Sequence, residues 1–384
     1  AYNTTMRGFL RGIGVKQMIT LSQAGFGELF GMYREAKSDF VDAHAYWDYA
    51  DSFYQPVKDV PMTPALGKGD VLTEGLAFWR VAGKPFTVTE YNICFPNEYR
   101  AECVPEFASF AAFQGWDAIY LFAYPNYEPS DKPDAIQFPL DAGADPAISC
   151  FFPTAAMMFR TGMIPTATES AVLPLPGEFP AARVAAGLRN RRAWEEKGIT
   201  PAMAFSYRVQ GGIGAAGSPA LPAAGSKILD VQTQDAVTAR YVADAPSAKV
   251  IAGFVGGQTV RVQDAMFQFG KLTHNYGALT LCAMDYKPLA ATSKALLTFV
   301  THTQNSGQQW DAAHAKLEKP GGGPILVDRA SVEVRLSVDG TRNVYALDAS
   351  GKRGAQMAAT FANGVLTFSI PQEAETVWFL IVKE

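Results

Sequence analysis

Cysteine and histidine are scarce in this chain of 384 residues, which contains four of each. The cysteines, Cys94, Cys103, Cys150 and Cys282, form no C-x-x-C pair, and no histidine lies close to any two of them. The spacing therefore gives no indication of a metal site, and we expect none. We expect the thiols to be free and buried. A disulfide between Cys94 and Cys103 is the alternative, because both lie in one loop-to-helix segment.

The chain also lacks an excess of positive charge and any long apolar run. Its net charge is -4 at pH 7, and lysine and arginine do not cluster with aromatic residues, so no nucleic-acid partner is expected. No apolar stretch approaches the roughly 20 residues of a transmembrane helix, so no membrane partner is expected. With 48% hydrophobic and 18% charged residues, the composition is that of a globular protein with room for two or more domains.

Several catalytic motifs are missing as well. The chain contains no G-x-S-x-G nucleophile elbow, no H-E-x-x-H zinc motif and no dinucleotide-binding fingerprint between a strand and a helix. The glycine-rich stretch over 211–226 resembles such a fingerprint only in composition, and we predict a surface loop there. We therefore expect no organic cofactor.

Residues 1–165 show apolar runs that alternate with helical patterns. We predict strands over 15–23, 40–48, 84–92 and 117–127, and helices between them, including one over 101–115. Strands that read as continuous apolar runs separated by helices are typical of a parallel sheet. Four such units predict the second half of a (β/α)₈ barrel, strands five to eight.

The pattern changes after this region. Residues 166–205 are Pro-rich at first and then helical, and we predict a connector there. From 206 to 384 the chain has many short alternating runs separated by glycine and asparagine turns, which predict an antiparallel β-sandwich domain. The predicted fold class is thus α/β plus all-β, with a catalytic half-barrel over 1–165 and a sandwich over 206–384.

The predicted strand ends carry the candidate chemistry. Glu90 ends the run "KPFTVTEYN", and His44 and Tyr46 lie near the end of "FVDAHAYWD". Barrel enzymes place catalytic groups at the carboxyl ends of their strands, so we expect these side chains at one mouth. Asp42 alternates with His44 and Tyr46, and we expect it to face the same side as a structural partner.

These segments resemble a known family. "TVTEYN", "FVDAHAYWD" and "DAIYLFAY" resemble strands seven, six and eight of the clan A retaining glycoside hydrolases, the cellulase-like (β/α)₈ enzymes. "DPAISCFFPTAAMMFRTGMIPT" resembles the exit from barrel to sandwich in bacterial members, and "LLTFVTHTQNSGQQW" resembles the sandwich that follows. The resemblance covers most of the chain, and its strength lies in the order of the pieces.

The resemblance implies a retaining hydrolase of a β-linked oligo- or polysaccharide, secreted or periplasmic, without cofactor or metal. It implies that Glu90 is the nucleophile and that His44 and Tyr46 bind substrate and orient it. The family's strand-eight tryptophan is missing, so Tyr124 or Phe122 would take its place. We expect Trp47 and Asn92 to contact the sugar too.

One family feature is absent. Retaining hydrolysis needs a second carboxyl group about 5–5.5 Å from the nucleophile, and the Asn-Glu that supplies it at strand four of the family does not occur here. Glu98 follows the wrong strand. The chain resembles the C-terminal part of such an enzyme, so we expect a second polypeptide to carry barrel strands one to four. Pairing of two copies is the alternative.

Other functions remain open. A non-catalytic carbohydrate-binding protein would keep the mouth and lack the acid, and a transglycosylase would use the same residues but exclude water. Residues 98–102, in the loop after Glu90, have either a specificity role or a structural one. His274, His302 and His314 lie far apart in the β-rich part, and we expect no catalytic role for them.

Overall fold

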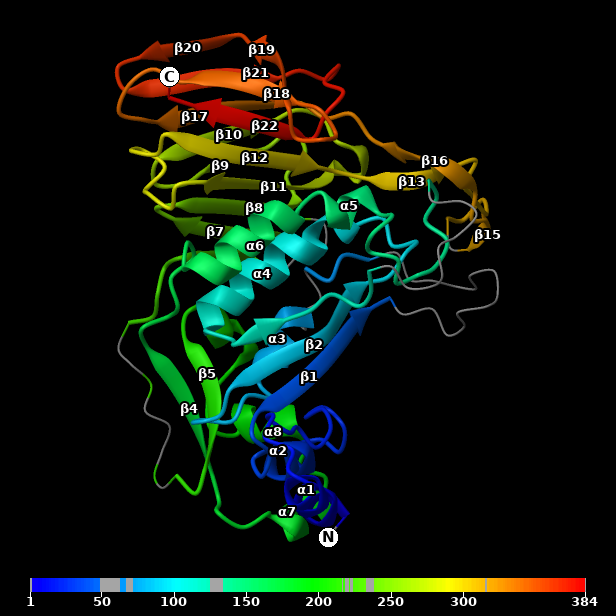
Figure 1. Ribbon diagram of the computed structural model, residues 1–384, viewed down its shortest axis with the longest axis vertical. Coiled ribbons are helices and arrows are strands. Elements are labelled where there is room, and N and C mark those ends of the chain that lie inside the picture. The colour runs from blue at the N-terminus through cyan, green and yellow to red at the C-terminus, as the bar shows by residue number, and fades with distance from the viewer. Residues whose placement is uncertain are drawn as a thin grey trace.

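The computed structural model describes residues 2–48, 63–66, 72–124, 134–215, 217, 221, 224–232, 238–314 and 316–383. In Figure 1 the antiparallel sheets lie at the top, and the helices α4 (Cys103–Gln114) and α6 (Phe152–Thr161) lie beneath them. A small parallel sheet follows below these helices. Among the described helices, none combines the length and the apolar character that a membrane span requires.

The parallel sheet carries the residues of greatest interest. Its strands are, in spatial order, β1 (Val41–Trp47), β2 (Phe86–Ile93) and β3 (Ala118–Ile119). The other helical segments of this half are α1 (Tyr2–Gly12), α2 (Leu29–Glu35), α3 (Leu72–Ala77), η1 (Arg100–Glu102) and α5 (Pro146–Ser149).

The predicted fold class is wrong, because the described residues form no half of a (β/α)₈ barrel. Strand makes up 34% and helix 21% of the structure, and the dominant sheet is antiparallel with eight strands. Among the described residues, parallel pairing occurs within β1–β3, in one further pair of strands and at an isolated bridge between Val81 and Gly211. Of the four parallel strands expected, two are full strands, the third is reduced to two residues, and 15–23 forms none.

Residues 15–23 form no strand because side-chain carboxylates bind their backbone amides. The Ile19 amide donates to Asp39 Oδ2 at 2.8 Å. The Leu21 and Ser22 amides both donate to Glu35 Oε2, at 3.2 and 3.3 Å. These bonds replace the ladder that a neighbouring strand would supply. The apolar run over 15–23 predicted a strand because the sequence does not reveal that distant carboxylates accept hydrogen bonds from its backbone amides.

The eight-stranded antiparallel sheet is buried on both faces near its centre. On β11, Leu279 and Leu281 belong to the core shared with the five-stranded sheet, whereas Ala278 and Cys282 face the helical layer. Continuous apolar runs therefore occur here in antiparallel strands, because helices cover one face and a second sheet covers the other. In spatial order the strands are β19 (Arg353–Met357), β18 (Asn343–Leu347), β22 (Trp378–Val382), β12 (Lys294–Val300), β11 (Tyr276–Ala283), β8 (Ala248–Phe254), β7 (Arg240–Ala245) and β6 (Leu229–Gln232).

Smaller sheets complete the fold. The five-stranded sheet consists of β20 (Ala359–Ala362), β21 (Val365–Ile370), β17 (Val332–Ser337), β10 (Ala265–Phe269) and β9 (Thr259–Arg261). The remaining strand pairs are β4 (Ser170–Leu175) with β5 (Arg208–Ile213), β13 (Thr303–Ser306) with β16 (Gly322–Val327), and β14 (Gln309–Trp310) with β15 (Leu317–Lys319). The remaining helical segments are α7 (Ala181–Ala185), α8 (Asn190–Glu195), η2 (Pro201–Phe205) and η3 (Thr273–Asn275).

The helix expected over 101–115 is present as α4, and every residue of it is buried. Its few polar side chains find partners in different neighbours. Glu106 accepts a hydrogen bond from Thr73 of α3, and the Ser109 hydroxyl lies 2.9 Å from the Tyr241 hydroxyl of β7. Gln114 Nε2 donates to the Ala204 carbonyl at 2.6 Å. A helix without a polar face is stable here because protein covers it on all sides.

The four cysteines are free and buried, which confirms the expectation and excludes the alternative bridge. Burial raises the pKa of Cys94, and burial together with the charge of Asp145 raises that of Cys150 to about 12. The thiolate is the reactive form of cysteine, so these thiols are inert near neutral pH.

Arg100 connects the loop after β2 to the antiparallel half of the molecule. Its Nε atom forms a salt bridge with Asp145, and its Nη2 atom donates to the Thr303 carbonyl at 3.1 Å. The Thr303 hydroxyl in turn donates to Asp145 Oδ1 at 2.8 Å. The side chains of Arg100 and Asp145 are 2% and 1% exposed, so their charges depend on each other.

Replacement of Arg100 by methionine is expected to lower the free energy of unfolding by about 3–5 kcal/mol, because Asp145 would remain as an unpaired buried charge. Denaturant unfolding measures the loss. The matched control is Arg335→Met, which removes an exposed ion pair with Glu333 that contributes at most about 1 kcal/mol. Equal losses in the two variants would contradict a stabilising role for the buried pair.

Candidate active site

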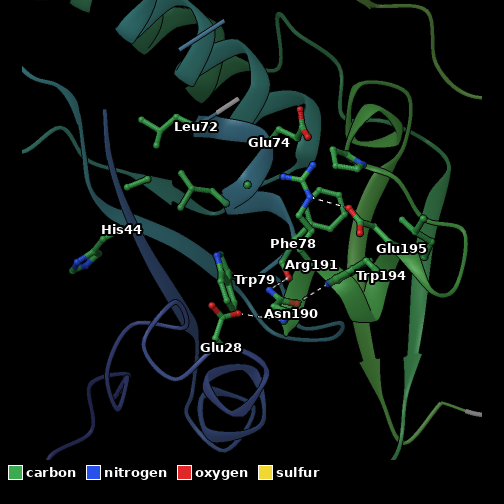
Figure 2. A pocket seen from close by; sticks show the side chains of 15 residues that line it. Glu28, His44, Leu72, Glu74, Phe78, Trp79, Asn190, Arg191, Trp194 and Glu195 are labelled. Atoms are coloured by element: carbon green, nitrogen blue, oxygen red, sulfur yellow. Dashed lines mark hydrogen bonds and ion pairs between the residues drawn. The ribbon is translucent and has the colours of Figure 1, made fainter. Parts of the chain in front are cut away.

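Strand β1 borders a pocket on one side and a polar cluster on the other. The pocket has a volume of about 340 Å³ and is lined by α3, α8 and nearby residues, among them Glu28, Glu74, Trp79 and Asn190. In Figure 2 the His44 ring, at the edge of this pocket, points away from these residues. The two features are therefore separate.

The polar groups of the pocket are largely engaged with one another. The Asn190 backbone N–H donates to Glu28 Oε2 at 3.2 Å, and Trp194 Nε1 donates to the side-chain oxygen Oδ1 of Asn190 at 2.8 Å. Burial raises the pKa of Glu74 to about 8, so this carboxyl group is neutral at neutral pH. Sequence patterns did not predict this pocket, because α3 and α8, which form two of its walls, lie more than a hundred residues apart in the chain.

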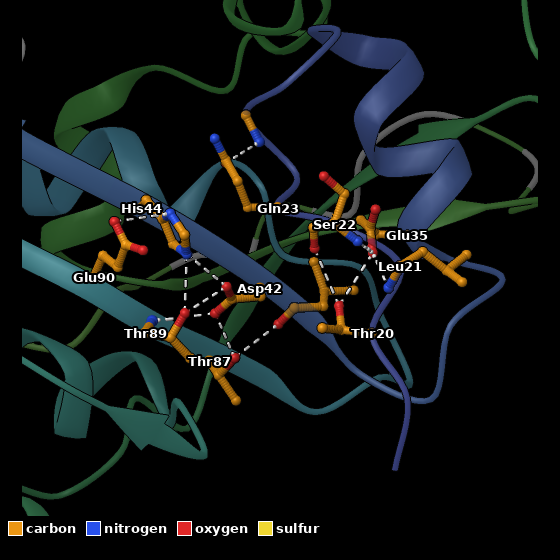
Figure 3. Close-up of polar contacts among 12 residues, drawn as sticks. Thr20, Leu21, Ser22, Gln23, Glu35, Asp42, His44, Thr87, Thr89 and Glu90 are labelled. Atoms are coloured by element: carbon orange, nitrogen blue, oxygen red, sulfur yellow. Dashed lines mark hydrogen bonds and ion pairs between the residues drawn. The ribbon is translucent and has the colours of Figure 1, made fainter. Parts of the chain in front are cut away.

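The polar cluster lies on the side of β1 to which the His44 ring points in Figure 2, and Figure 3 shows its contacts. Alternation along β1 places Asp42, His44 and Tyr46 on this face, as expected from the sequence. His44 of β1 pairs with Glu90 of β2, and the register between the two strands shifts between Ala43 and His44. This irregularity places Glu90 directly beside His44, so the two parallel strands bring a carboxylate and an imidazole into contact.

Asp42 anchors the cluster. It is 5% exposed, and its Oδ1 atom accepts from the Thr87 hydroxyl at 2.7 Å and from the Thr89 amide at 3.1 Å. Its Oδ2 atom lies 2.7 Å from the Thr89 hydroxyl and 2.9 Å from His44 Nε2. Burial opposes ionisation, but these hydrogen bonds hold the pKa of Asp42 below its ordinary value. The sequence analysis missed Thr87 and Thr89, although both alternate with Val88 in the run before Glu90.

His44 lies between two carboxylates. Because Asp42 accepts a hydrogen bond, His44 Nε2 carries the proton and Nδ1 faces Glu90 Oε2 at 3.4 Å. Burial opposes a positive charge on the ring, but the hydrogen bond to Asp42 and the charges of Glu90 and Asp42 outweigh it. The pKa of His44 is therefore raised above 6.5.

Glu90 is held but accessible. The Tyr46 hydroxyl donates to Glu90 Oε2 at 2.6 Å, on the oxygen that also faces His44. The Glu90 side chain is 33% exposed. Within the described part of the chain, Oε1 accepts no hydrogen bond, so one oxygen is oriented by the protein and the other is available to a ligand.

The other predicted site residues lie elsewhere. Asn92 is fully buried, and its amide donates to the Phe122 and Leu140 carbonyls at 2.8 and 3.2 Å. Trp47 packs against the core and donates to the Thr63 carbonyl at 2.8 Å. The structure therefore does not bring these two side chains to Glu90.

Aromatic rings lie beside the cluster. Phe122 meets Tyr46 edge-on at 6.3 Å between ring centroids and is 37% exposed. Tyr124 is 70% exposed and packs against Phe152 at 6.3 Å. Of the two residues expected to replace the family's strand-eight tryptophan, Phe122 is the one in contact with Tyr46.

Searches against protein-family models, curated proteins and solved structures found no match to this chain. The resemblance to clan A hydrolases therefore rests on the sequence motifs alone.

The Asp42→Asn variant tests the arrangement around His44. Because folding raises the pKa of His44, its pairing stabilises the protein fully below pH 6.5, and this contribution disappears as the pH rises through the folded-state pKa. Loss of the Asp42 charge is expected to lower the pKa of His44, as measured by NMR titration of the imidazole protons.

The matched control is Asp230→Asn, at an exposed position of β6, which is expected to leave the titration unchanged. A His44 titration that is the same in wild type and Asp42→Asn would contradict the ion-pair arrangement.

Proposed function

We propose that this chain carries the nucleophile of a retaining glycoside hydrolase acting on a β-linked oligo- or polysaccharide, with Glu90 as that nucleophile. The observation that supports the proposal best is the Tyr46–Glu90–His44–Asp42 network between β1 and β2. It orients one oxygen of an accessible carboxylate and leaves the other free.

The geometry suits the first step of retention. Glu90 Oε1 would attack the anomeric carbon and form a glycosyl ester, while Tyr46 and His44 hold Oε2. Positive charge on His44, which Asp42 supports, favours the carboxylate form of its neighbour. Asp42 is thus a positioning residue, since it acts on Glu90 only through the imidazole.

The second carboxyl group has to come from outside the described residues. Asp42 lies behind His44 and is almost fully buried, so it has no access to a leaving group. We propose that an acid/base glutamate on a second polypeptide protonates the leaving oxygen and then activates water.

The exposed rings support a carbohydrate ligand. Tyr120, Phe122 and Tyr124 are 59%, 37% and 70% exposed, and apolar ring faces stack on sugars. A polysaccharide substrate favours a secreted or periplasmic location. Glu90 is the one accessible carboxylate of the cluster, which also favours a second candidate, a carbohydrate-binding protein without hydrolytic activity.

A fluorosugar with a dinitrophenolate leaving group tests Glu90 independently of the missing acid, because this leaving group needs no protonation. We expect a burst of dinitrophenolate and a stable glycosyl adduct on the peptide that contains Glu90, detected by mass spectrometry. Glu90→Gln should form no adduct, and Tyr46→Phe should react about 100-fold more slowly, since it loses one oriented donor.

The controls are Glu333→Gln, at a half-buried position of β17, and Tyr286→Phe, at an exposed position, and both should react like wild type. Binding of the sugar without an adduct in wild type would favour the carbohydrate-binding protein. Neither binding nor an adduct, across glucosides, mannosides and xylosides, would contradict both candidates.

A further inference from the structure

Three of the four histidines of the chain lie against one carboxylate, that of Glu98. Glu98 lies in the loop after β2, His274 in η3, His302 between β12 and β13, and His314 between β14 and β15. Segments separated by up to 216 residues therefore meet at Glu98. Nothing in the proposed hydrolase mechanism uses this cluster.

The distances between ligand atoms are those of a metal site. His274 Nε2 lies 3.2 Å from Glu98 Oε2, and His314 Nε2 lies 3.0 Å from Glu98 Oε1. His302 Nε2 lies 3.7 Å from Glu98 Oε1. In a tetrahedral zinc site with metal–ligand distances near 2.0–2.1 Å, ligand atoms lie about 3.3 Å apart. One ligand atom from each of Glu98, His274 and His302 lies within 4.8 Å of the others.

His302 supplies an independent observation. Its side chain is 7% exposed, and its Nε2 atom has no hydrogen-bond partner among the described residues. Its Nδ1 atom lies 3.2 Å from Asp328 Oδ2, so Nδ1 carries the proton and Nε2 presents a lone pair. That lone pair faces the Glu98 carboxylate, which is also an acceptor. Two buried acceptors that face each other stay unpaired unless a proton or a metal ion lies between them.

The contact with Asp328 has a further meaning. A metal-binding histidine usually donates its second ring N–H to a carboxylate, which fixes the tautomer and makes the free nitrogen a better ligand. Asp328 stands in this relation to His302. As metal ligands the imidazoles would be neutral, and a divalent ion would then balance the two negative charges of Glu98 and Asp328.

We propose that Glu98, His274 and His302 bind a divalent transition-metal ion, zinc in the first place. His314, whose Nε2 atom lies 3.0 Å from Glu98 Oε1, would orient this carboxylate. Imidazole nitrogens with one carboxylate oxygen favour zinc over magnesium or calcium, which prefer oxygen ligands. Three protein ligands leave the fourth position of a tetrahedral zinc site open to water or another ligand. The ion would join the loop that leaves β2 to the antiparallel sheets.

The test uses the full, untagged chain, stripped with a chelator and dialysed against zinc chloride. We expect one zinc ion per chain by elemental analysis, and a cobalt-loaded protein with the intense visible absorption of tetrahedral Co²⁺. Zinc is also expected to raise the melting temperature of the stripped protein.

Variants separate ligands from bystanders. Glu98→Gln and His302→Gln should each weaken zinc binding at least 100-fold, and Asp328→Asn should weaken it about 10–100-fold through the orientation of His302. His44→Gln replaces the only histidine outside the cluster and should bind zinc like wild type. Circular dichroism of the stripped proteins shows whether each variant folds. If Glu98→Gln does not fold, the milder variant Asp328→Asn still tests the site.

Either of two results would overturn the proposal. One is a folded wild-type chain that binds neither zinc nor cobalt, in which case protons alone pair the histidines with Glu98. The other is zinc bound with equal affinity by wild type, Glu98→Gln and His302→Gln. Neither result bears on Glu90, because the fluorosugar reaction requires no metal.

Discussion

The burial of α4 on all sides is the constraint on which the rest of the structure depends. This helix lies between the parallel sheet, which carries Glu90, and the eight-stranded sheet. Its polar side chains bond to α3, to β7 and to the carbonyl of Ala204, so each neighbour is fixed in register against the helix. An unmatched polar group at such a depth costs about 1–3 kcal/mol, and α4 therefore tolerates few alternative arrangements of its neighbours.

The loop between β2 and α4 connects the two candidate sites. Glu90 lies in β2, Glu98 lies in the loop that follows, and Arg100 lies in η1, where it forms its buried salt bridge to Asp145. The loop is thus held at one end by the parallel sheet and at the other by the antiparallel half. A metal ion at Glu98 would add a third restraint to the segment that leaves the Glu90 strand, so stability and active-site geometry would be coupled through a few residues.

Local pattern predicted the parts that depend on local geometry. Period-two alternation placed Asp42, His44 and Tyr46 on one face, and the acid at the end of the next strand was correctly expected beside them. The same reasoning failed for Asn92, whose side chain turned out to bind carbonyls in the core. It also failed for the barrel, because continuous apolar strands were taken as evidence of parallel pairing, whereas helices and a second sheet cover both faces of an antiparallel one.

By itself, the sequence determined the strands that carry His44 and Glu90, the helix α4 and the burial of the free cysteines, because each follows from the order of neighbouring residues. Only the tertiary structure decided the layers, the partners of the amides over 15–23, and the meeting of His274 and His302 at Glu98. Histidines so far apart give no spacing signal, since the distance between them in space is set by how whole sheets and loops pack and not by the chain between them.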